Sequence, residues 1–225
     1  MFDPKRAAVI NLPVEKSPHL LVRGNMPLIK GAFAYSEIES ALNLDFDADR
    51  FVSTSIIDNT GERGSWSLEL EAFGVLPDGY PAENWPPYVR QPDWNPGKLQ
   101  GNGSLSYGTG SREKSHLIWW PFEGMSPTDD PGVFLHSPGW DFAGCVEYLY
   151  GLYTNLQEPA TVIYIHCMLG ADRTGALHAG LLVRAGVGIE EALTISSSAT
   201  SAGAPSPDYQ RLARAYAKER GESVE

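Results

Sequence analysis

The stretch that decides the fold is Ile165-His166-Cys167-Met168-Leu169-Gly170-Ala171-Asp172-Arg173-Thr174-Gly175. The apolar run before it, residues 161–165, is rich in β-branched side chains and is typical of a buried strand. The mostly apolar residues 176–184 that follow predict a helix. We therefore expect Cys167 where a strand ends and Arg173 where a helix begins.

The loop between this strand and this helix has the composition of an anion-binding site. Its glycines and small residues allow successive backbone N–H groups to point inward, and the helix adds the positive end of its dipole. A thiol at the floor of such a loop is stabilised as the nucleophilic thiolate. Arg173 can donate two hydrogen bonds to a phosphoryl group, and Thr174 can donate its hydroxyl to the sulfur. The alternative, a buried structural cysteine, leaves this spacing of residues unexplained.

These residues resemble the signature of the cysteine-dependent protein tyrosine and dual-specificity phosphatase superfamily: His-Cys, five residues, Arg, Ser or Thr, and Gly. The matching positions are His166, Cys167, Arg173, Thr174 and Gly175. The resemblance implies a phosphate-binding loop made here of Met168, Leu169, Gly170, Ala171, Asp172, Arg173 and Thr174. It also implies a cysteinyl-phosphate intermediate, no metal or other cofactor, and an aspartate that acts as general acid from a separate movable loop.

The general acid is the part of this signature that the sequence leaves open. A strand-like segment, residues 117–122, runs into residues 123–132, where the superfamily keeps its acid. This junction is similar to the Tyr-Pro-Phe-Glu-Asp loop of tensin-type lipid phosphatases and the Trp-Pro-Asp loop of tyrosine phosphatases. On the tensin-type pattern, Gly124 stands where the catalytic aspartate is expected, so the proton must come from another residue.

Three sources of the proton are open, each of which must come within hydrogen-bond reach of the leaving oxygen. Asp129 and Asp130 lie between two prolines and suit the tip of a mobile loop, so they are our first choice. Glu123 is closer to the end of the strand and comes next. Asp172 is the third, because myotubularin-like lipid phosphatases carry an aspartate at that place in the loop. The alternative for each of these carboxylates is a solvated loop position.

The rest of the chain predicts the other layers of an α/β domain. A strand and turn are expected at residues 20–27, and a further strand at residues 51–58. Helices are expected at residues 36–42, 142–156, 189–195 and 208–220. Residues 66–75 resemble the Glu-rich short helix that follows the strand at residues 51–58 in the phosphatase family, which implies a further helix there. We therefore predict a single phosphatase domain over residues 1–225, with a central, mainly parallel sheet flanked by helices and the active site at the carboxyl ends of the strands.

The sequence also predicts roles for individual side chains in these elements. Ser36 and Glu39 form a capping box that predicts the start of the first helix. Arg23 lies in a segment similar to the Arg-Gly/Ser-x-x-Pro start of small dual-specificity-like phosphatases, and we expect it to be an exposed surface arginine. Cys145 is expected to be an ordinary core residue.

Residues 77–115 differ in composition from the rest of the chain. Prolines alternate with tyrosines and tryptophans, and a Gly/Ser-rich run over residues 97–111 follows. A segment of this length inside a compact domain has two interpretations. It is either an ordered flap that shapes access to the substrate or a decoration remote from the site.

The amino-acid composition argues against some classes of binding partner and favours one cellular location. The formal net charge of −11 argues against non-specific nucleic-acid binding and against an anionic membrane surface. The two cysteines, Cys145 and Cys167, and the need to keep a thiolate reduced favour an intracellular protein without a disulfide. Neither a signal peptide nor an apolar run of membrane-spanning length is evident, so we expect a cytoplasmic protein.

The predicted function is hydrolysis of a phosphorylated protein or small phosphomonoester, by a tyrosine or dual-specificity phosphatase. Phosphoinositide phosphatases of the tensin type carry lysines in the loop, which this chain lacks, so a polyphosphorylated ligand is the weaker alternative. RNA 5′-triphosphatases share the scaffold, but the acidic balance argues against RNA. Gly124 motivates a last alternative, a catalytically weak phosphate-binding module.

Overall fold

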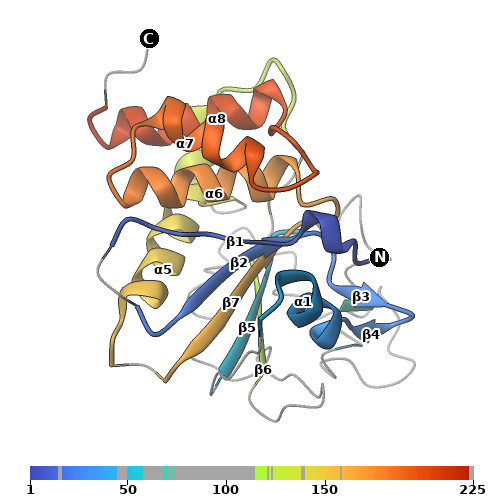
Figure 1. Ribbon diagram of the computed structural model, residues 1–225. Coiled ribbons are helices and arrows are strands. Elements are labelled where there is room, and N and C mark those ends of the chain that lie inside the picture. The colour runs from blue at the N-terminus through green and yellow to red at the C-terminus, as the bar shows by residue number, and fades with distance from the viewer. Residues whose placement is uncertain are drawn as a thin grey trace.

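The computed structural model describes residues 1–14, 17–44, 50–57, 68–69, 72, 115–120, 122, 124–137, 140–157 and 159–222. Within these residues one mixed sheet forms the centre, and helices lie on both of its faces (Figure 1). Across the sheet the strands follow the order β1 (Ala8–Val9), β2 (Leu20–Gly24), β7 (Thr161–His166), β5 (Arg50–Ser55) and β6 (Ser115–Trp119). β1 pairs with β2 antiparallel, and the other neighbours pair in parallel. The predicted α/β fold with a mainly parallel central sheet is confirmed.

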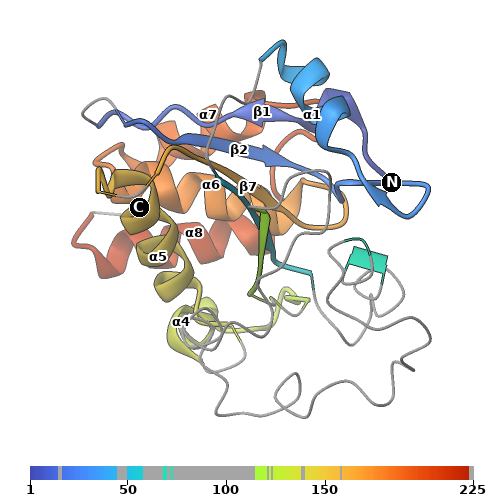
Figure 2. The same ribbon diagram turned by 90° about the horizontal axis from the view of Figure 1, so that it is seen from below.

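The helices are divided unequally between the two faces of the sheet. One face carries α1 (Tyr35–Leu42), near the small hairpin of β3 (Leu28–Ile29) and β4 (Ala32–Phe33). The helices of the opposite face are α4 (Pro131–His136), α5 (Phe142–Thr154), α6 (Asp172–Arg184), α7 (Ile189–Ser198) and α8 (Pro207–Glu219). There α5, α7 and α8 pack on α6, and α4 packs on α5 and α8 (Figure 2). α6, which follows the candidate loop, is therefore enclosed by other helices.

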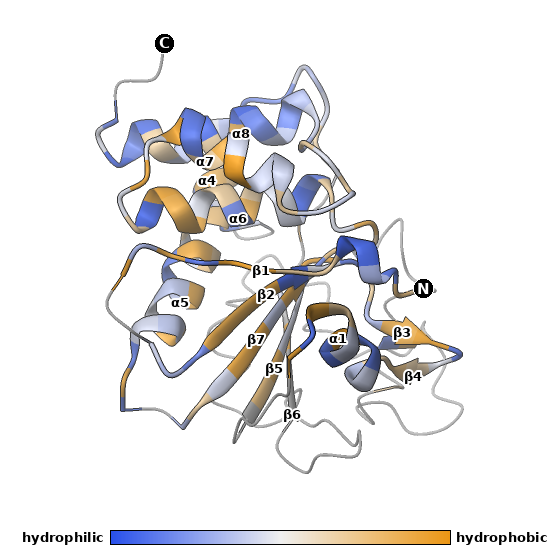
Figure 3. Cartoon of the chain, viewed as in Figure 1, coloured by the Kyte–Doolittle hydropathy of each residue, from blue (hydrophilic) through white to orange (hydrophobic). Residues whose placement is uncertain are grey.

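Strand β7 shows how the sequence divides the core into two layers. Successive side chains of a strand point to opposite faces, so Val162 and Tyr164 pack towards Ile38 of α1. Ile163 and Ile165 belong to the larger cluster that includes the inner faces of α5 and α6. Every residue of β7 is buried, which explains why its sequence is a continuous apolar run rather than an alternating one. In Figure 3 the hydrophobic colour follows β2 and β7, whereas the outer helix α8 carries more hydrophilic residues.

Two local predictions differ from the structure. The N-cap of α1 is Ala34 and no side chain caps this end, so the predicted capping box of Ser36 and Glu39 is wrong. The helix begins before Ser36, where Tyr35 packs against Phe51 of β5 at a ring-centroid distance of 5.1 Å. The sequence also did not predict α4, a short helix that starts at Pro131 immediately after the acidic pair.

Some predictions fall outside the described residues. Of the expected insertion at residues 77–115, only Ser115 is described, as the first residue of β6. Of the short helix expected at residues 66–75, Leu68, Glu69 and Ala72 are described, and all three are helical. The choice between a flap and a decoration, and the single-domain boundary, stay predictions. None of the helices in the described part of the chain has the length and apolar composition needed to cross a membrane.

Candidate active site

Cys167 lies at the base of the loop that joins β7 to α6. It follows directly on the last residue of β7, and α6 begins at Asp172. Its Sγ accepts a hydrogen bond from the backbone N–H of Gly170 at 3.3 Å, and only 4% of the residue is exposed. The order of strand, thiol, loop and helix predicted from the sequence is therefore present.

Three successive carbonyl groups of this loop are held from outside it. The Met168 carbonyl accepts the Met26 N–H at 3.2 Å, and the Leu169 carbonyl accepts Arg6 Nη1 at 2.6 Å. The Gly170 carbonyl accepts Arg23 Nη2 at 2.7 Å. In a trans peptide the N–H points opposite to the carbonyl, so fixing these carbonyls outward directs the N–H groups of the next residues inward. The loop can therefore present several donors to one anion.

Gly170 is required in this loop for two independent reasons. Its φ is +71°, in the left-handed region that side chains with a Cβ disfavour. A Cβ at this position would also lie 2.6 Å from the backbone oxygen of Gly24, at the end of β2. The same residue that donates to the sulfur thus holds the loop against the neighbouring strand.

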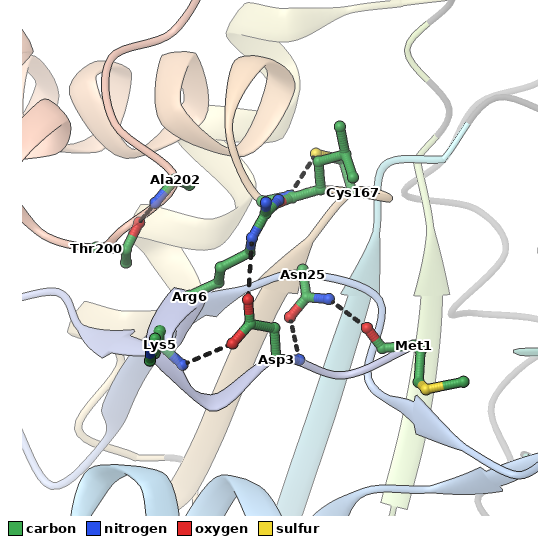
Figure 4. A network of polar contacts seen from close by, with 10 residues as sticks. Met1, Asp3, Lys5, Arg6, Asn25, Cys167, Thr200 and Ala202 are labelled. Atoms are coloured by element: carbon green, nitrogen blue, oxygen red, sulfur yellow. Dashed lines mark hydrogen bonds and ion pairs between the residues drawn. The ribbon is translucent and has the colours of Figure 1, made fainter.

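The N-terminal segment forms part of the outer wall of the loop (Figure 4). Asp3, whose side chain caps the short 3-10 helix η1 (Pro4–Arg6), forms an ion pair with Arg6 at 3.4 Å. Asn25 binds the same segment through two hydrogen bonds, from the Asp3 N–H and to the Met1 carbonyl. The N-terminal segment therefore orients Arg6 towards Leu169, a contact that the sequence did not predict.

Arg23 is completely buried, which corrects the expectation that it would be an exposed arginine. It lies on β2, where it pairs with Ile165 of β7 on one side and Ala8 of β1 on the other, so it belongs to an inner strand of the sheet. Its Nη1 donates to the Ser196 carbonyl at 2.8 Å and lies 2.9 Å from Ser196 Oγ and 3.0 Å from His178 Nδ1. Ser196 in turn donates its hydroxyl to the Gly175 carbonyl at 2.8 Å. Arg23 therefore connects the loop to α6 and α7.

Burial lowers the pKa values of both titratable groups in this cluster, Arg23 and His178. Burial lowers the pKa of Arg23 to about 10, while the negative charge of a Cys167 thiolate opposes that shift. Burial, followed by the charge of Arg23, lowers the pKa of His178 to about 3. At neutral pH, Arg23 is therefore charged and His178 is a neutral hydrogen-bond acceptor.

A second buried polar cluster lies beside His166, the residue before Cys167. Glu69 Oε1 is 2.8 Å from His166 Nε2, and Glu69 Oε2 accepts the Ser55 hydroxyl at 2.7 Å. Both side chains of the Glu69–His166 pair are fully buried. Sequence reasoning placed Glu69 in a short helix but missed this contact, because nothing local in the sequence connects residues 69 and 166.

Arg173 lies in the first turn of α6, as its position in the motif predicted. Its Nε is 3.4 Å from the hydroxyl of Tyr209, near the start of α8. Burial raises the pKa of Tyr209, and the charge of Arg173 opposes this shift, so the tyrosine is neutral at pH 7. The next residue, Thr174, has a buried hydroxyl without a hydrogen-bond partner in the described part of the chain. Tyr209 is a site neighbour that the sequence gave no reason to single out.

Comparison with known proteins identifies this architecture. No protein-family model matches the chain, and no curated protein matches its sequence. Among solved structures, the chain is similar to kinase associated phosphatase with a serine substituted for its catalytic-site cysteine, at 12% identity and a TM-score of 0.52 over 97% of each chain. The chain has the dual-specificity and tyrosine phosphatase fold.

Two further phosphatase structures are similar to the chain. Human DUSP28 is 12% identical, with a TM-score of 0.45 over 95% of this chain and 96% of its own. Tk-PTP in its active form is 13% identical, with a TM-score of 0.44 over 95% of this chain and 97% of its own.

Within this phosphatase fold, the two aspartates chosen as general acids stabilise local backbone. Asp130 is the N-cap of α4, and its Oδ1 accepts the Gly132 N–H at 2.9 Å. Asp129 Oδ2 accepts the Ser126 N–H at 2.6 Å, closing a turn. Arg211 of α8 donates to the carbonyl groups of this turn at Ser126 and Asp129. The predicted loop tip is therefore a capped turn that leads into a helix.

The remaining acid candidates are placed differently. Asp172 directs its Oδ1 to the Ser206 N–H at 2.6 Å, so this carboxylate ties the start of α6 to the loop before α8. Glu123 lies outside the described residues. Cys145 is fully buried in α5, and burial raises the pKa of its thiol, so it is the core residue that we expected.

Proposed function

We propose that this chain is a cysteine-dependent phosphatase that hydrolyses phosphomonoesters on proteins, at phosphotyrosine or with dual specificity. One observation carries the proposal: the Cys167 sulfur accepts the Gly170 N–H at 3.3 Å, at the base of a loop whose carbonyls are held outward. This is the arrangement that an anionic nucleophile and a phosphoryl group both require. The fold shared with a phosphatase that has a catalytic cysteine supports the same assignment.

The reaction proceeds in two steps, formation of a phosphocysteine and its hydrolysis. The Cys167 thiolate attacks phosphorus in line, an S–P bond forms, the ester P–O bond breaks, and the leaving oxygen takes a proton from a carboxylic acid. Water then attacks the phosphocysteine and gives a proton to the same carboxylate, and the S–P bond breaks to release inorganic phosphate and the thiolate. Arg173 and the N–H groups of residues 168–173 bind the phosphoryl oxygens through both steps.

The proton donor is proposed among Asp130, Asp129 and Glu123, in that order. In the described structure each aspartate accepts a backbone N–H with one carboxyl oxygen, so its other oxygen would have to carry the proton to the leaving group when substrate binds. Catalytic hydrogen bonds often form only in the substrate complex, so this geometry is compatible with the role.

The substrate class follows from the loop's side chains. Met168, Leu169 and Ala171 carry no charge and Asp172 is acidic, so the loop offers no cation beyond Arg173 to a second phosphate. Arg6 does not fill this role, because its Nη1 is bound to the Leu169 carbonyl and its Nε faces Asp3. A single phosphomonoester therefore fits better than a polyphosphorylated inositol lipid.

A second candidate function is a phosphate-binding module with weak turnover. It is favoured by the hydrogen bonds of Asp129 and Asp130 to local backbone, because the site lacks a proton donor if these bonds keep both carboxyl groups away from the leaving oxygen. Such a module would keep its affinity for phosphate because Cys167, Arg173 and the loop amides are present.

Hydrolysis of phosphotyrosine and of an activated aryl phosphate separates the two functions. We expect Cys167→Ser to abolish turnover of both esters while inorganic phosphate still binds. Among Glu123→Gln, Asp129→Asn and Asp130→Asn, the variant that removes the acid should lower phosphotyrosine turnover by about a hundredfold or more. It should affect the activated ester much less. Undiminished turnover by Cys167→Ser would exclude the phosphatase.

A further inference from the structure

Arg23 is a buried cation whose hydrogen-bond partners are all neutral. Its guanidinium contacts the carbonyls of Gly170 and Ser196, the Ser196 hydroxyl and His178, and none of these partners in the described part of the chain is a carboxylate. Taking an ion out of water costs several kcal/mol unless an opposite charge compensates it. A fully buried arginine therefore calls for an anion nearby.

The neutral partners of Arg23 hold it in place but do not balance its charge. His178 is uncharged at neutral pH, since burial lowers its pKa to about 3, and it accepts from the guanidinium. Ser196 accepts from Arg23 with both its carbonyl and its hydroxyl oxygen. Because α6 supplies His178 and α7 supplies Ser196, two packed helices fix the position of the cation.

Gly170 links the guanidinium of Arg23 to the thiol of Cys167. Arg23 Nη2 donates to the Gly170 carbonyl at 2.7 Å, and the Gly170 N–H donates to Cys167 Sγ at 3.3 Å. We propose that Arg23 is a positioning residue that serves as the buried counter-ion of the Cys167 thiolate and fixes Gly170 as its donor. This role rests on the proposed function, because it matters only where Cys167 reacts as an anion. In this arrangement Arg23 interacts with the thiolate, and Arg173 binds the phosphoryl group.

Other titratable groups around the thiol do not replace Arg23. They are Tyr164 and His166 on β7, Glu69, Arg173 on α6, and Tyr209 on α8. Burial raises the pKa of both tyrosines, so they are neutral at pH 7. Glu69 is hydrogen-bonded to His166 and Ser55. Arg173 is the other cation, and it is half-buried in the first turn of α6.

The rate at which iodoacetamide alkylates Cys167, followed against pH by peptide mass spectrometry, tests the counter-ion role. Arg23→Gln and Arg23→Met remove the charge, and we expect the pH of half-maximal alkylation to rise by about one unit or more. Arg23→Lys keeps the charge and should stay nearer the wild-type midpoint. Arg6→Gln is the matched control, because it removes a partly exposed guanidinium from the adjacent carbonyl of the same loop. Its shift should be far smaller.

An unchanged midpoint in a folded neutral variant would overturn the proposal, as would equal shifts for the Arg6 and Arg23 variants. If neither neutral variant folds, the free energy of unfolding of the wild type and of Cys167→Ser is compared between pH 6 and pH 9. The wild type should gain stability over Cys167→Ser as pH rises, because the thiolate can balance the buried cation and a serine hydroxyl cannot. A difference independent of pH would reject the role. Neither readout needs turnover, so the counter-ion and the phosphatase can fail separately.

Discussion

The two sides of the candidate site are built in different ways. On the loop side, the fully buried Arg23 of β2 donates to the Gly170 carbonyl and also contacts α6 and α7, and Gly170 in turn donates to Cys167. On the acid side, Asp129 and Asp130 accept backbone N–H groups two or three residues away in a partly exposed turn, and Arg211 of α8 donates to two carbonyls of that turn. The buried first side suits a nucleophile that must keep its place, whereas the more exposed carboxylates of the second side can exchange a backbone N–H for another partner. A phosphatase needs both properties.

The sharpest way to break the loop side is Gly170→Ala. The new Cβ would meet the Gly24 oxygen at 2.6 Å, and the φ of +71° is strained for alanine. Because the loop must shift, we expect the proposed phosphatase activity to fall by roughly a hundredfold or more. Gly151→Ala in α5 is the matched control, since a Cβ there meets nothing within 4 Å. It should leave activity intact and stabilise the helix by about 0.5–1 kcal/mol. Comparable activity of the two variants would contradict this account of the loop.

A smaller effect on the same side comes from pH. The pKa of His178 is about 3 in the folded protein, below its value in the unfolded chain, so the unfolded state binds the extra proton. The free energy of unfolding should therefore fall as pH drops below about 6.5, by on the order of 1–3 kcal/mol towards pH 4. His178→Gln still offers an acceptor to Arg23 but does not titrate, so its denaturant curves should depend less on pH. Identical pH dependence in both proteins would show that His178 does not contribute.

The smallest expected effect is on the acid side. Asp130→Ala removes the N-cap of α4 and should lower the free energy of unfolding by about 1 kcal/mol. Asp130→Asn keeps a capping oxygen and should be nearly as stable as the wild type, although it cannot donate a proton. Chemical denaturation of both variants, together with their turnover, therefore separates capping from catalysis. Equal loss of stability in both would mean that the charge, and not the cap, stabilises this turn.

The sequence predicted those parts of the site that are local along the chain. Cys167, Gly170 and Arg173 belong to one continuous stretch, and the apolar strand before it and helix after it confirm where they lie. Arg23 was misassigned because its burial depends on Gly170 and Ser196, which are 147 and 173 residues away. Only the assembled sheet and helices bring these groups together.

The same limit explains the other residues that were missed. The contact of Glu69 with His166 spans 97 residues, and that of Tyr209 with Arg173 spans 36. The first turn of α1 shows the opposite failure, because Ser36 and Glu39 carry a strong local signal that tertiary packing of Tyr35 overrides. Local chemistry is readable from the sequence, whereas the surroundings that tune it are not.

The position of β7 has a consequence for how the protein is made. β7 pairs with β2 on one side and with β5 on the other, yet both partners precede it by more than a hundred residues. During synthesis the sheet therefore stays open at its middle until residue 166 has left the ribosome. Arg6, Arg23 and Met26 are synthesised long before the loop residues that they contact. Cys167 therefore lacks these contacts in the nascent chain until β7 has joined the sheet.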